Sequence, residues 1–377
     1  MTSSRRPQIL IVDDSIVMRS VLRSVIGAET GLEVAATAAD GESALRAVEN
    51  LRPDLVLLDV EMPVMDGLAT LRELRARGYK MPVIMCSSLT QRGASVTIEA
   101  LAGGATDYVA KPSGQSSREA AIQTLAQELI PKIHALTVHP HALPPGATHP
   151  APMLPLAPPF TAQPVSSIPR VLAIGVSTGG PAALDVLLSV LPADFPLPVV
   201  IVQHMPELFT KLLAKQLSLK CRLRVRESAE GDAVRAGTVY IARGNWHLEV
   251  RPASRAGFPA TLHLNQGPLE NHCRPSVDAL FRSAVAVYGA GVLAVVLTGM
   301  GSDGLIGCRI VREHGGSVLV QDQATSAVWG MPGAVAHAGL AHKVLPLNAI
   351  GLEILRMAGL THSEVRELRE SAVMQCK

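Results

Sequence analysis

The chain has 377 residues, of which 48% are hydrophobic and 18% charged. This composition supports buried cores and excludes a largely disordered chain, and the length exceeds that of one ordinary domain of roughly 100 to 200 residues. The 34 Lys and Arg residues nearly balance the 32 Asp and Glu residues, so the net charge favours neither a nucleic acid nor a membrane surface as a partner.

No targeting or membrane-spanning segment stands out in the sequence. The apolar run near the N-terminus is broken by Asp13 and Asp14, which excludes the apolar core of a signal peptide. No other stretch approaches the roughly 20 apolar residues that span a bilayer. The five cysteines form no CxxC pair, as is typical of free thiols in a reducing compartment. The sequence predicts a cytoplasmic protein without membrane insertion.

Residues 8–136 alternate short β-rich apolar runs with helical segments. Five strands that alternate with five helices are typical of a doubly wound α/β fold with a parallel sheet. We therefore predict an N-terminal α/β domain over residues 1–136. The expected strands cover 8–12, 32–38, 54–60, 82–87 and 107–110, and the expected helices cover 17–26, 42–51, 68–78, 96–104 and 118–133.

Polar residues stand at the carboxyl ends of these strands, where open α/β sheets place their sites. They are Asp13, Asp14, Asp59, Ser87 and Lys111. Converging carboxylates repel one another unless a hard divalent cation such as Mg²⁺ lies among them. Such a site leaves room for a phosphoryl group, whose oxygens a lysine and a hydroxyl can hold. Singly, each residue is an ordinary strand-end or turn residue. Together they predict phosphate transfer to a carboxylate, with Asp59 as the acceptor.

The motifs VDDS, LLDVEMPVMDG, SS and KP, in this order and spacing, resemble a response-regulator receiver domain. The resemblance covers nearly all of residues 8–136 and implies that a histidine kinase donates the phosphoryl group. The implied roles are phosphorylation of Asp59, Mg²⁺ binding by Asp13, Asp14 and Asp59, and switching by Ser87, Lys111 and Tyr108.

Residues 137–169 contain frequent prolines and no apolar period, so we expect an extended, semi-rigid linker. Histidine tracts bind metals, but a proline-rich segment offers no fixed ligand geometry, and solvated histidines are the favoured interpretation. The histidines in or just before the linker are His134, His139, His141 and His149.

A second doubly wound α/β domain is expected over residues 170–360, followed by a tail at 361–377. β-Rich runs return there and are again separated by helical segments. The strands that we expect cover 171–177, 197–204, 237–242, 294–299 and 316–322, with helices that include 181–191 and 276–289.

Gly175, Ser177 and Gly179 match the G-x-S-x-G elbow, in which tight glycines let a serine project from a strand-to-helix turn. Backbone N–H groups at the start of the helix would stabilise a developing oxyanion. A phosphate-binding turn is the alternative. The turn lacks both G-x-G-x-x-G and G-K-[ST], which disfavours nucleotide binding.

His204 is the last residue of the β-rich run at 197–204 and directly follows its apolar part, LPVVIVQ, at the same sheet edge as Ser177. It is the candidate general base. Asp303, in a glycine-rich loop, is the candidate group that orients the imidazole. Cys273 is a rival nucleophile, but it lacks a glycine-rich elbow. With His204 as base, activity should fall on the acid side near its ordinary pKa of about 6.5.

The blocks GVSTGG, QHMP, NHCRPSVD, LTGMGSDG and WGMPG resemble the catalytic domain of CheB, the chemotaxis protein-glutamate methylesterase. The resemblance implies hydrolysis of glutamate γ-methyl esters on chemoreceptors with release of methanol, and deamidation of receptor glutamines, with no cofactor for the esterase reaction. It implies Ser177 as nucleophile, His204 as base and Asp303 as its orienting group. The N–H groups of Thr178 and Met300 are the candidates for the oxyanion hole.

Arg243 departs from the family pattern, which commonly has proline at this turn. Arg274 could bind an acidic receptor surface, with a surface salt bridge as the alternative. A receiver joined to a hydrolase predicts that phosphorylation controls the hydrolase. Two other functions stay open: a receiver-gated hydrolase or deamidase of a different sensory array, and an inactive adaptor.

Overall fold

The computed structural model describes residues 5–88, 90–112, 117–137, 168–255 and 257–360. By its internal contacts the chain divides into two units, Met1–Met153 and Leu154–Lys377. The tail at 361–377 and the linker histidines His139, His141 and His149 lie outside the described residues. His134 is described, and its Nε2 lies 3.7 Å from a carboxylate oxygen of Glu29.

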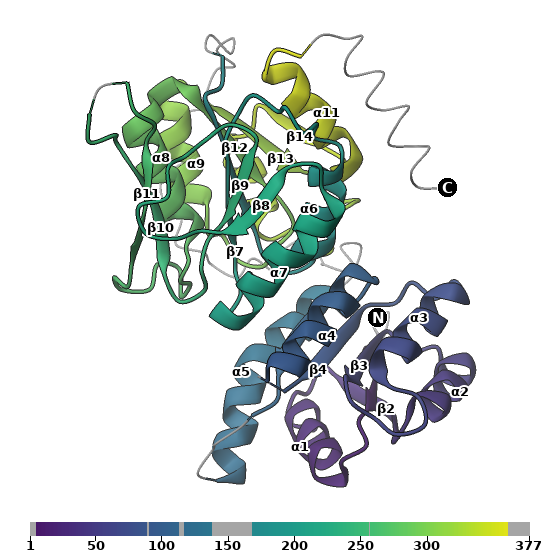
Figure 1. Ribbon diagram of the computed structural model, residues 1–377. Coiled ribbons are helices and arrows are strands. Elements are labelled where there is room, and N and C mark those ends of the chain that lie inside the picture. Colours follow the sequence, from purple (N-terminus) through teal and green to yellow (C-terminus); the bar gives the residue numbers. More distant parts are fainter. Residues whose placement is uncertain (1–4, 89, 113–116, 138–167, 256, 361–377) are drawn as a thin grey trace. The chain divides into compact units, whose positions relative to one another are not determined.

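The N-terminal unit is a five-stranded parallel sheet with the strand order β2-β1-β3-β4-β5 (Figure 1). Buried side chains of α1 and α5 pack on one face of the sheet, against residues such as Ile9, Ile11 and Leu57. The predicted fold class is confirmed here. In chain order the elements are β1 Gln8–Val12, α1 Ile16–Gly27, β2 Glu33–Ala38, α2 Gly41–Leu51, β3 Leu55–Asp59, α3 Gly67–Ala76, β4 Val83–Ser87, α4 Gln91–Ala102, β5 Asp107–Ala110 and α5 Arg118–Thr137.

Side-chain caps start four of these helices just beyond the strand ends. Ser15, Asp40, Asp66 and Thr90 each accept a hydrogen bond from a backbone N–H of the first helical turn. Gly67 begins α3 against the end of β3, where a Cβ would lie 1.9 Å from the carbonyl oxygen of Asp59. The lack of a side chain at this position lets the helix approach the carboxyl edge of the sheet.

The C-terminal unit contains a seven-stranded parallel sheet with the order β14-β13-β12-β6-β7-β9-β8, and a separate antiparallel hairpin of β10 and β11. Its elements are β6 Val171–Val176, α6 Gly180–Ser189, β7 Val199–Gln203, α7 Glu207–Lys220, β8 Arg224–Glu227, β9 Thr238–Ile241, β10 His247–Arg251, β11 Thr261–Asn265, α8 Val277–Tyr288, the 3₁₀ helix η1 Gly289–Gly291, β12 Val292–Val296, α9 Leu305–Glu313, β13 Ser317–Gln321, α10 Met331–His337, β14 Lys343–Leu345 and α11 Leu347–Met357.

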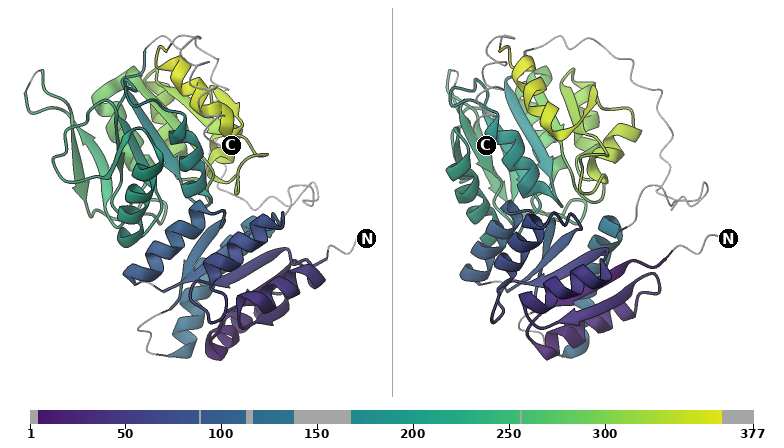
Figure 2. Two further views of the ribbon diagram at one scale, coloured as in Figure 1. Left: turned by 45° about the vertical axis from the view of Figure 1, so that its right-hand side comes forward. Right: turned by 90° about the vertical axis from the view of Figure 1, so that its right-hand side faces the viewer.

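Helices cover both faces of this second sheet, as a doubly wound fold requires. Helices α8, α9 and α10 share one buried core with the hairpin, whereas α6 contacts α7 and α11 (Figures 1 and 2). The predicted architecture is confirmed, and the structure adds three elements to the five expected strands: the hairpin and two edge strands. The edge strands β8 and β14 are short and carry Arg224, Arg226 and Lys343.

No helix within the described part of the chain is long and apolar enough to cross a membrane.

Candidate active site and acidic cluster

Three carboxylates of the N-terminal unit meet at the carboxyl edge of its sheet. Asp13 and Asp14 follow β1, and Asp59 ends β3, the neighbouring strand. One oxygen from each lies within 4.8 Å of the others. Asp13 is fully buried and Asp59 is 4% exposed. Two buried carboxylates and the exposed carboxylate of Asp14 at this spacing suit a small, hard divalent cation.

Lys111, directly after β5, compensates two of these negative charges. Its Nζ lies 2.8 Å from an oxygen of Asp13 and 2.7 Å from an oxygen of Asp59. Burial raises the pKa of the Asp59 carboxyl, and the hydrogen bond from Lys111 offsets this only in part. Burial lowers the pKa of Lys111, but its bonds to the two carboxylates raise it overall. The ammonium therefore stays charged beside the candidate phosphoacceptor.

Ser87 and Tyr108, the other two candidate switch residues, lie on adjacent strands β4 and β5. The Ser87 hydroxyl is buried, donates to the Ser88 carbonyl and accepts from the Thr97 hydroxyl. The Tyr108 ring is 6% exposed, and Lys132 Nζ lies 5.1 Å from its centre. Within the described residues, no hydrogen bond connects the Ser87 hydroxyl with the acidic cluster.

Ser177 stands on the predicted elbow between β6 and α6. Its backbone N–H donates to the Thr298 carbonyl, and its carbonyl accepts from Gln203. Gly179 has a φ of 78°, a left-handed conformation that favours glycine. A Cβ on Gly180 would lie 1.9 Å from the Gln203 amide oxygen. The glycines thus let the turn close tightly against the neighbouring strand, and Ser177 is left half-buried at the sheet edge.

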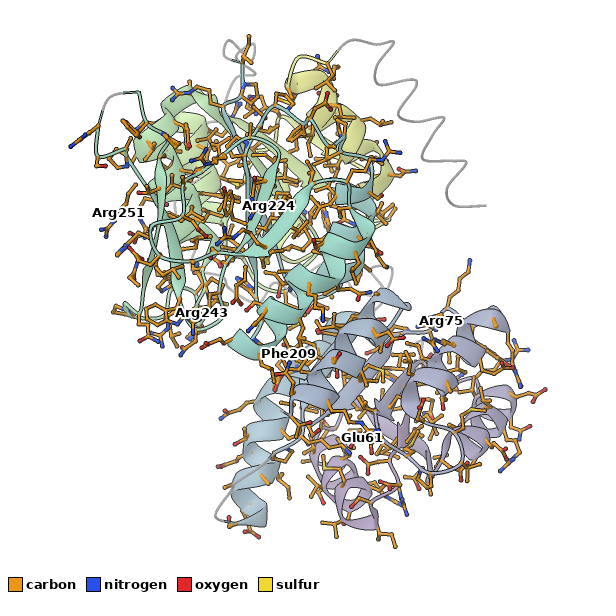
Figure 3. All side chains as sticks on the ribbon, viewed as in Figure 1. Glu61, Arg75, Phe209, Arg224, Arg243 and Arg251 are labelled. Carbon is orange, nitrogen blue, oxygen red and sulfur yellow. The ribbon has the colours of Figure 1, made fainter. Side chains whose placement is uncertain are left out.

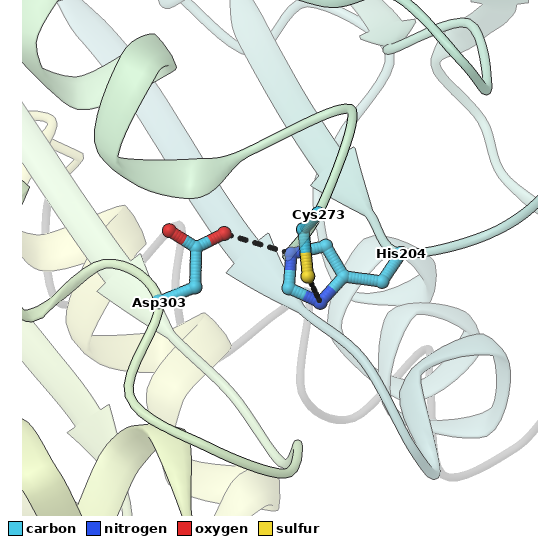
Figure 4. Close-up of side chains that lie close together, drawn as sticks. All are labelled: His204, Cys273 and Asp303. Atoms are coloured by element: carbon cyan, nitrogen blue, oxygen red, sulfur yellow. Dashed lines mark hydrogen bonds and ion pairs between the residues drawn. The ribbon is translucent and has the colours of Figure 1, made fainter. Parts of the chain in front are cut away.

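His204 lies at the same edge because it follows β7, the strand that pairs with β6. Its backbone N–H donates to the carbonyl of Val176, directly before the serine. Its Nε2 lies 2.8 Å from Oδ2 of Asp303 (Figure 4). Among the described residues, the Ser177 hydroxyl makes no hydrogen bond. The structure therefore joins His204 with Asp303 directly and brings Ser177 to their edge of the sheet.

Asp303 is held by five further donors besides His204. Its Oδ2 also accepts from the Val277 N–H at 2.7 Å. The donors to Oδ1 are Asn271 Nδ2 at 2.9 Å, Ser276 Oγ at 2.8 Å, Asp278 N at 3.1 Å and Gly304 N at 3.0 Å. Because both oxygens are occupied, Asp303 is a hydrogen-bonded anchor and a poor metal ligand.

Asn271 and Ser276 were not among the predicted site residues. Both lie in the NHCRPSVD block that carries the family resemblance, but the sequence did not indicate that they contact Asp303. Asn271 also donates to the buried Asp278 carboxylate at 2.8 Å. Burial, together with the nearby charge of Asp303, raises the pKa of Asp278.

His204 and Asp303 shift each other's pKa in opposite directions. Burial lowers the pKa of His204, but its hydrogen bonds to Asp303 and Cys273 outweigh burial and raise the pKa from 6.5 to about 9. Burial raises the pKa of Asp303, but the bond and charge of His204 and the other donors lower it from 3.8 to about 2. For a histidine base with this pKa, the predicted acid limit of activity lies above pH 6.5.

The second nitrogen of His204 faces a thiol. Cys273 Sγ lies 3.7 Å from His204 Nδ1, whereas Asp303 contacts the other ring nitrogen, Nε2 (Figure 4). Cys273 is half-buried. Because it comes from a turn and not from a strand-to-helix elbow, the structure gives it no helix N-terminus for an oxyanion.

Arg243 lies in a turn after β9, where the Trp246 N–H donates to its carbonyl. Its guanidinium donates to Glu207 at the start of α7 and lies 5.5 Å from the Trp246 ring centre. Figure 3 shows the position of Arg243 in the C-terminal unit. Arg274 donates to the carbonyls of Gln266 and Gly267 and to the side chain of Asn245. Within the described residues, Arg274 makes these loop hydrogen bonds and not the surface salt bridge that was the alternative to receptor binding.

Two families match the two units of the chain. Residues 9–123 match the response regulator receiver domain, and residues 172–354 match the CheB methylesterase. A protein-glutamate methylesterase/protein-glutamine glutaminase of Trichodesmium erythraeum is 46% identical over 93% of this chain and 99% of its own length. A protein of the same description from Nocardioides is 50% identical over 93% of this chain and 94% of its own.

Among solved structures, the catalytic domain of the Thermotoga maritima CheB methylesterase is 40% identical and covers 50% of this chain and 98% of its own, with a TM-score of 0.48. Because the identity to the full-length relatives extends across both units, the chain belongs to the CheB methylesterase family, with an N-terminal response regulator receiver domain.

Proposed function

We propose that Ser177, His204 and Asp303 are the catalytic triad of this protein-glutamate methylesterase and protein-glutamine glutaminase. The observation that carries the proposal is the 2.8 Å bond between His204 and Asp303, at the sheet edge where the elbow presents Ser177. A serine at the elbow, an imidazole at the same sheet edge and a carboxylate bonded to that imidazole are the parts of a serine hydrolase.

The hydrogen bonds assign a tautomer to His204. With Nε2–H donating to Asp303, the lone pair lies on Nδ1, the nitrogen that the Cys273 thiol faces at 3.7 Å. In the reaction this lone pair would take the proton of Ser177 as its oxygen attacks the ester carbonyl. The imidazolium then protonates the leaving methoxide, and methanol departs. Water then attacks the carbonyl of the acyl-enzyme, with His204 again taking the proton, and the glutamate carboxylate is released from Ser177. A glutamine side chain follows the same path with ammonia as the leaving group.

The N–H groups of Thr178 and Met300 are our candidates for the oxyanion hole. Met300 follows β12, the strand next to that of the serine. In the described part of the chain its N–H has no hydrogen-bond acceptor. A donor that is already in place stabilises a developing oxyanion without reorganisation.

The acidic cluster fits Mg²⁺, which would neutralise the carboxylates and the incoming phosphoryl oxygens. We assign Asp13, Asp14 and Asp59 to the ion and Asp59 to phosphorylation by a histidine kinase. Lys111 is then placed to hold a phosphoryl oxygen, and Ser87 and Tyr108 respond to it. The substrates would be chemoreceptors, reached from the cytoplasm.

The domain limits proposed from the sequence are a receiver at 1–136, a linker at 137–169, a catalytic domain at 170–360 and a tail at 361–377. We propose that the receiver restrains the hydrolase until Asp59 is phosphorylated. Methanol release by the full-length protein should rise when a small phosphodonor and Mg²⁺ are added, and Asp59→Asn should stay at the low rate. Equal stimulation of Asp59→Asn would contradict this regulation.

The experiment for the triad is Ser177→Ala in the full-length protein. The loss of the only hydroxyl at the elbow should lower methanol release from methylated receptor membranes by a factor on the order of 10⁴ to 10⁶. Thermal unfolding should stay unchanged, because the side chain makes no hydrogen bond within the described residues. Near-normal methanol release by this variant would reject the triad. Methanol release from these membranes also separates the enzyme from an inactive adaptor.

A further inference from the structure

The thiol beside the catalytic histidine has no part in the proposed ester hydrolysis. Of the cysteines within the described residues, Cys86 and Cys308 are buried, while Cys221 and Cys273 are half-buried. Burial, with the charge of Asp185 in support, raises the pKa of Cys221 to about 12. Cys273 instead faces His204 Nδ1 at 3.7 Å. It is the accessible thiol of the described chain with a base beside it.

The position of the sulfur is fixed by the loop that carries it. Glu270 and Cys273 exchange both of their backbone N–H···O bonds, at 3.1 and 2.8 Å. The two residues between them, Asn271 and His272, have φ values of 50° and 62°, as in a tight two-residue hairpin turn. The Asn271 side chain anchors this turn on Asp303. The same carboxylate thus orients both the imidazole and the turn that presents the thiol.

We propose that Cys273 is a redox modification site, oxidised by peroxides, and that its oxidation switches off the esterase by blocking His204. This proposal depends on His204 being the base of the proposed function. The geometry gives the thiol what reactive cysteines need, namely a nearby imidazole that can take the proton and partial access to solvent.

The reaction balances with the peroxide as the only co-reactant. The thiol proton moves to His204 Nδ1, and Sγ attacks one peroxide oxygen, so that an S–O bond forms as the O–O bond breaks. The second oxygen leaves as hydroxide and takes the proton from the imidazolium to give water. The sulfur is oxidised by two electrons to a sulfenic acid, and the peroxide is reduced.

Inhibition follows from the occupancy of the two ring nitrogens. Nε2 is bonded to Asp303, so Nδ1 is the nitrogen that must activate Ser177. An oxygen added to Cys273 Sγ would stand against Nδ1 and compete for its lone pair. Thiols reduce a sulfenic acid back to the thiol through a disulfide, so activity should return.

The test uses the full-length protein, hydrogen peroxide as oxidant and dimedone to trap sulfenic acid, with peptide mass spectrometry to separate the cysteines. Wild-type protein should acquire dimedone at Cys273 and lose methanol release in parallel, and dithiothreitol without dimedone should restore the rate. Cys273→Ala should keep its activity in the same peroxide, and the matched control Cys221→Ala should lose activity as the wild type does. Loss of activity by Cys273→Ala at the wild-type rate would overturn the proposal.

Thiol reactivity can also be measured without any esterase activity. Iodoacetamide should label Cys273 faster than Cys221, on the order of tenfold. Ser177→Ala should leave this ratio unchanged, whereas His204→Gln should bring Cys273 to the rate of Cys221. Equal labelling of the two cysteines in the wild type would reject the proposal and leave the triad intact. Methanol release by Ser177→Ala would reject the triad and leave the thiol measurement valid.

Discussion

An asparagine at position 303 keeps the size of the side chain, removes its charge and leaves one acceptor oxygen for six donors. Four of these donors surround Oδ1 and two surround Oδ2. The amide oxygen should therefore take the Oδ1 place, and the amide NH₂ should face His204 and the Val277 N–H. Because this NH₂ donates, His204 must accept at Nε2, and the ring proton moves to Nδ1. In that tautomer His204 cannot take the proton of Ser177.

The size of the effect has two parts. Raising the His204 pKa from 6.5 to about 9 corresponds to about 3 kcal/mol in favour of the imidazolium. Lowering the Asp303 pKa from 3.8 to about 2 corresponds to about 2 kcal/mol. We use the 2 kcal/mol from Asp303, because Cys273 also contributes to the shift of His204. Losing about 2 kcal/mol of transition-state stabilisation slows the reaction about 30-fold. The wrong tautomer adds to this, and the same change in another serine hydrolase lowers kcat about 10⁴-fold. We expect a loss of that order.

The assay is methanol release from methylated receptor membranes by full-length Asp303→Asn, with circular dichroism melting to show that the variant is folded. Asp278→Asn is the matched control. Asp278 is also buried and shares the Asn271 donor, and it accepts from the Gly307 N–H at 2.6 Å without a bond to His204. It should lose less than about tenfold. If Asp303→Asn kept a tenth of the activity, or if both variants fell equally, the orienting role of Asp303 would be refuted.

Three further predictions concern pH, packing and the acidic cluster. Because neutral His204 is the base and its pKa is raised to about 9, kcat/KM should rise from pH 7 toward 9, and a flat profile there would contradict a histidine base. Gly67→Ala should lower the free energy of unfolding by about 2 kcal/mol or more through the clash with the carbonyl of Asp59. Gly27→Ala, which has open space around it, should change the free energy of unfolding by less than about 1 kcal/mol. Equal denaturation midpoints for the two variants would count against the packing. Lys111→Met should leave two buried carboxylates unpaired, so Mg²⁺ should raise its Tm more than that of the wild type, and no Mg²⁺-dependent difference in Tm would reject the cation site.

The proposed triad could be predicted because each of its members ends or follows a strand of a parallel sheet. The strands before Ser177 and His204 are continuous apolar runs with few charges, which is a clear signal for buried strands. Asp303 follows β12 in a glycine-rich loop. Since the carboxyl ends of such strands share an edge, the position of the three residues after strands was enough to predict that they lie at the same edge.

The donors around Asp303 could not be predicted in this way. Asn271 reaches the carboxylate only because it adopts a positive φ in a two-residue turn, and neither the turn nor its direction has a periodic signal. The raised pKa of His204 could not be predicted for the same reason. Its shift depends on the Cys273 thiol, which arrives from a loop 69 residues away in sequence.

The edge and hairpin strands were not predicted for a different reason. The expected strands were apolar runs, whereas β8 has the sequence RVRE and β14 the sequence KVL. Edge strands have one neighbour, so their side chains need not be apolar. The hairpin strands HLEVR and TLHLN alternate polar and apolar residues over only five positions, which is a weak pattern in isolation.

The charged edges of the catalytic sheet affect how crowded copies of the chain behave. An edge strand presents unpaired N–H and C=O groups that can recruit a strand from another molecule and begin aggregation. Here one edge carries two arginines in four residues, and the other is three residues long and starts with a lysine. Charged side chains and a short length at the edge both oppose the addition of another strand. We therefore expect the sheet to resist intermolecular strand addition at high protein concentration, and replacing Arg224 and Arg226 by threonine to promote it.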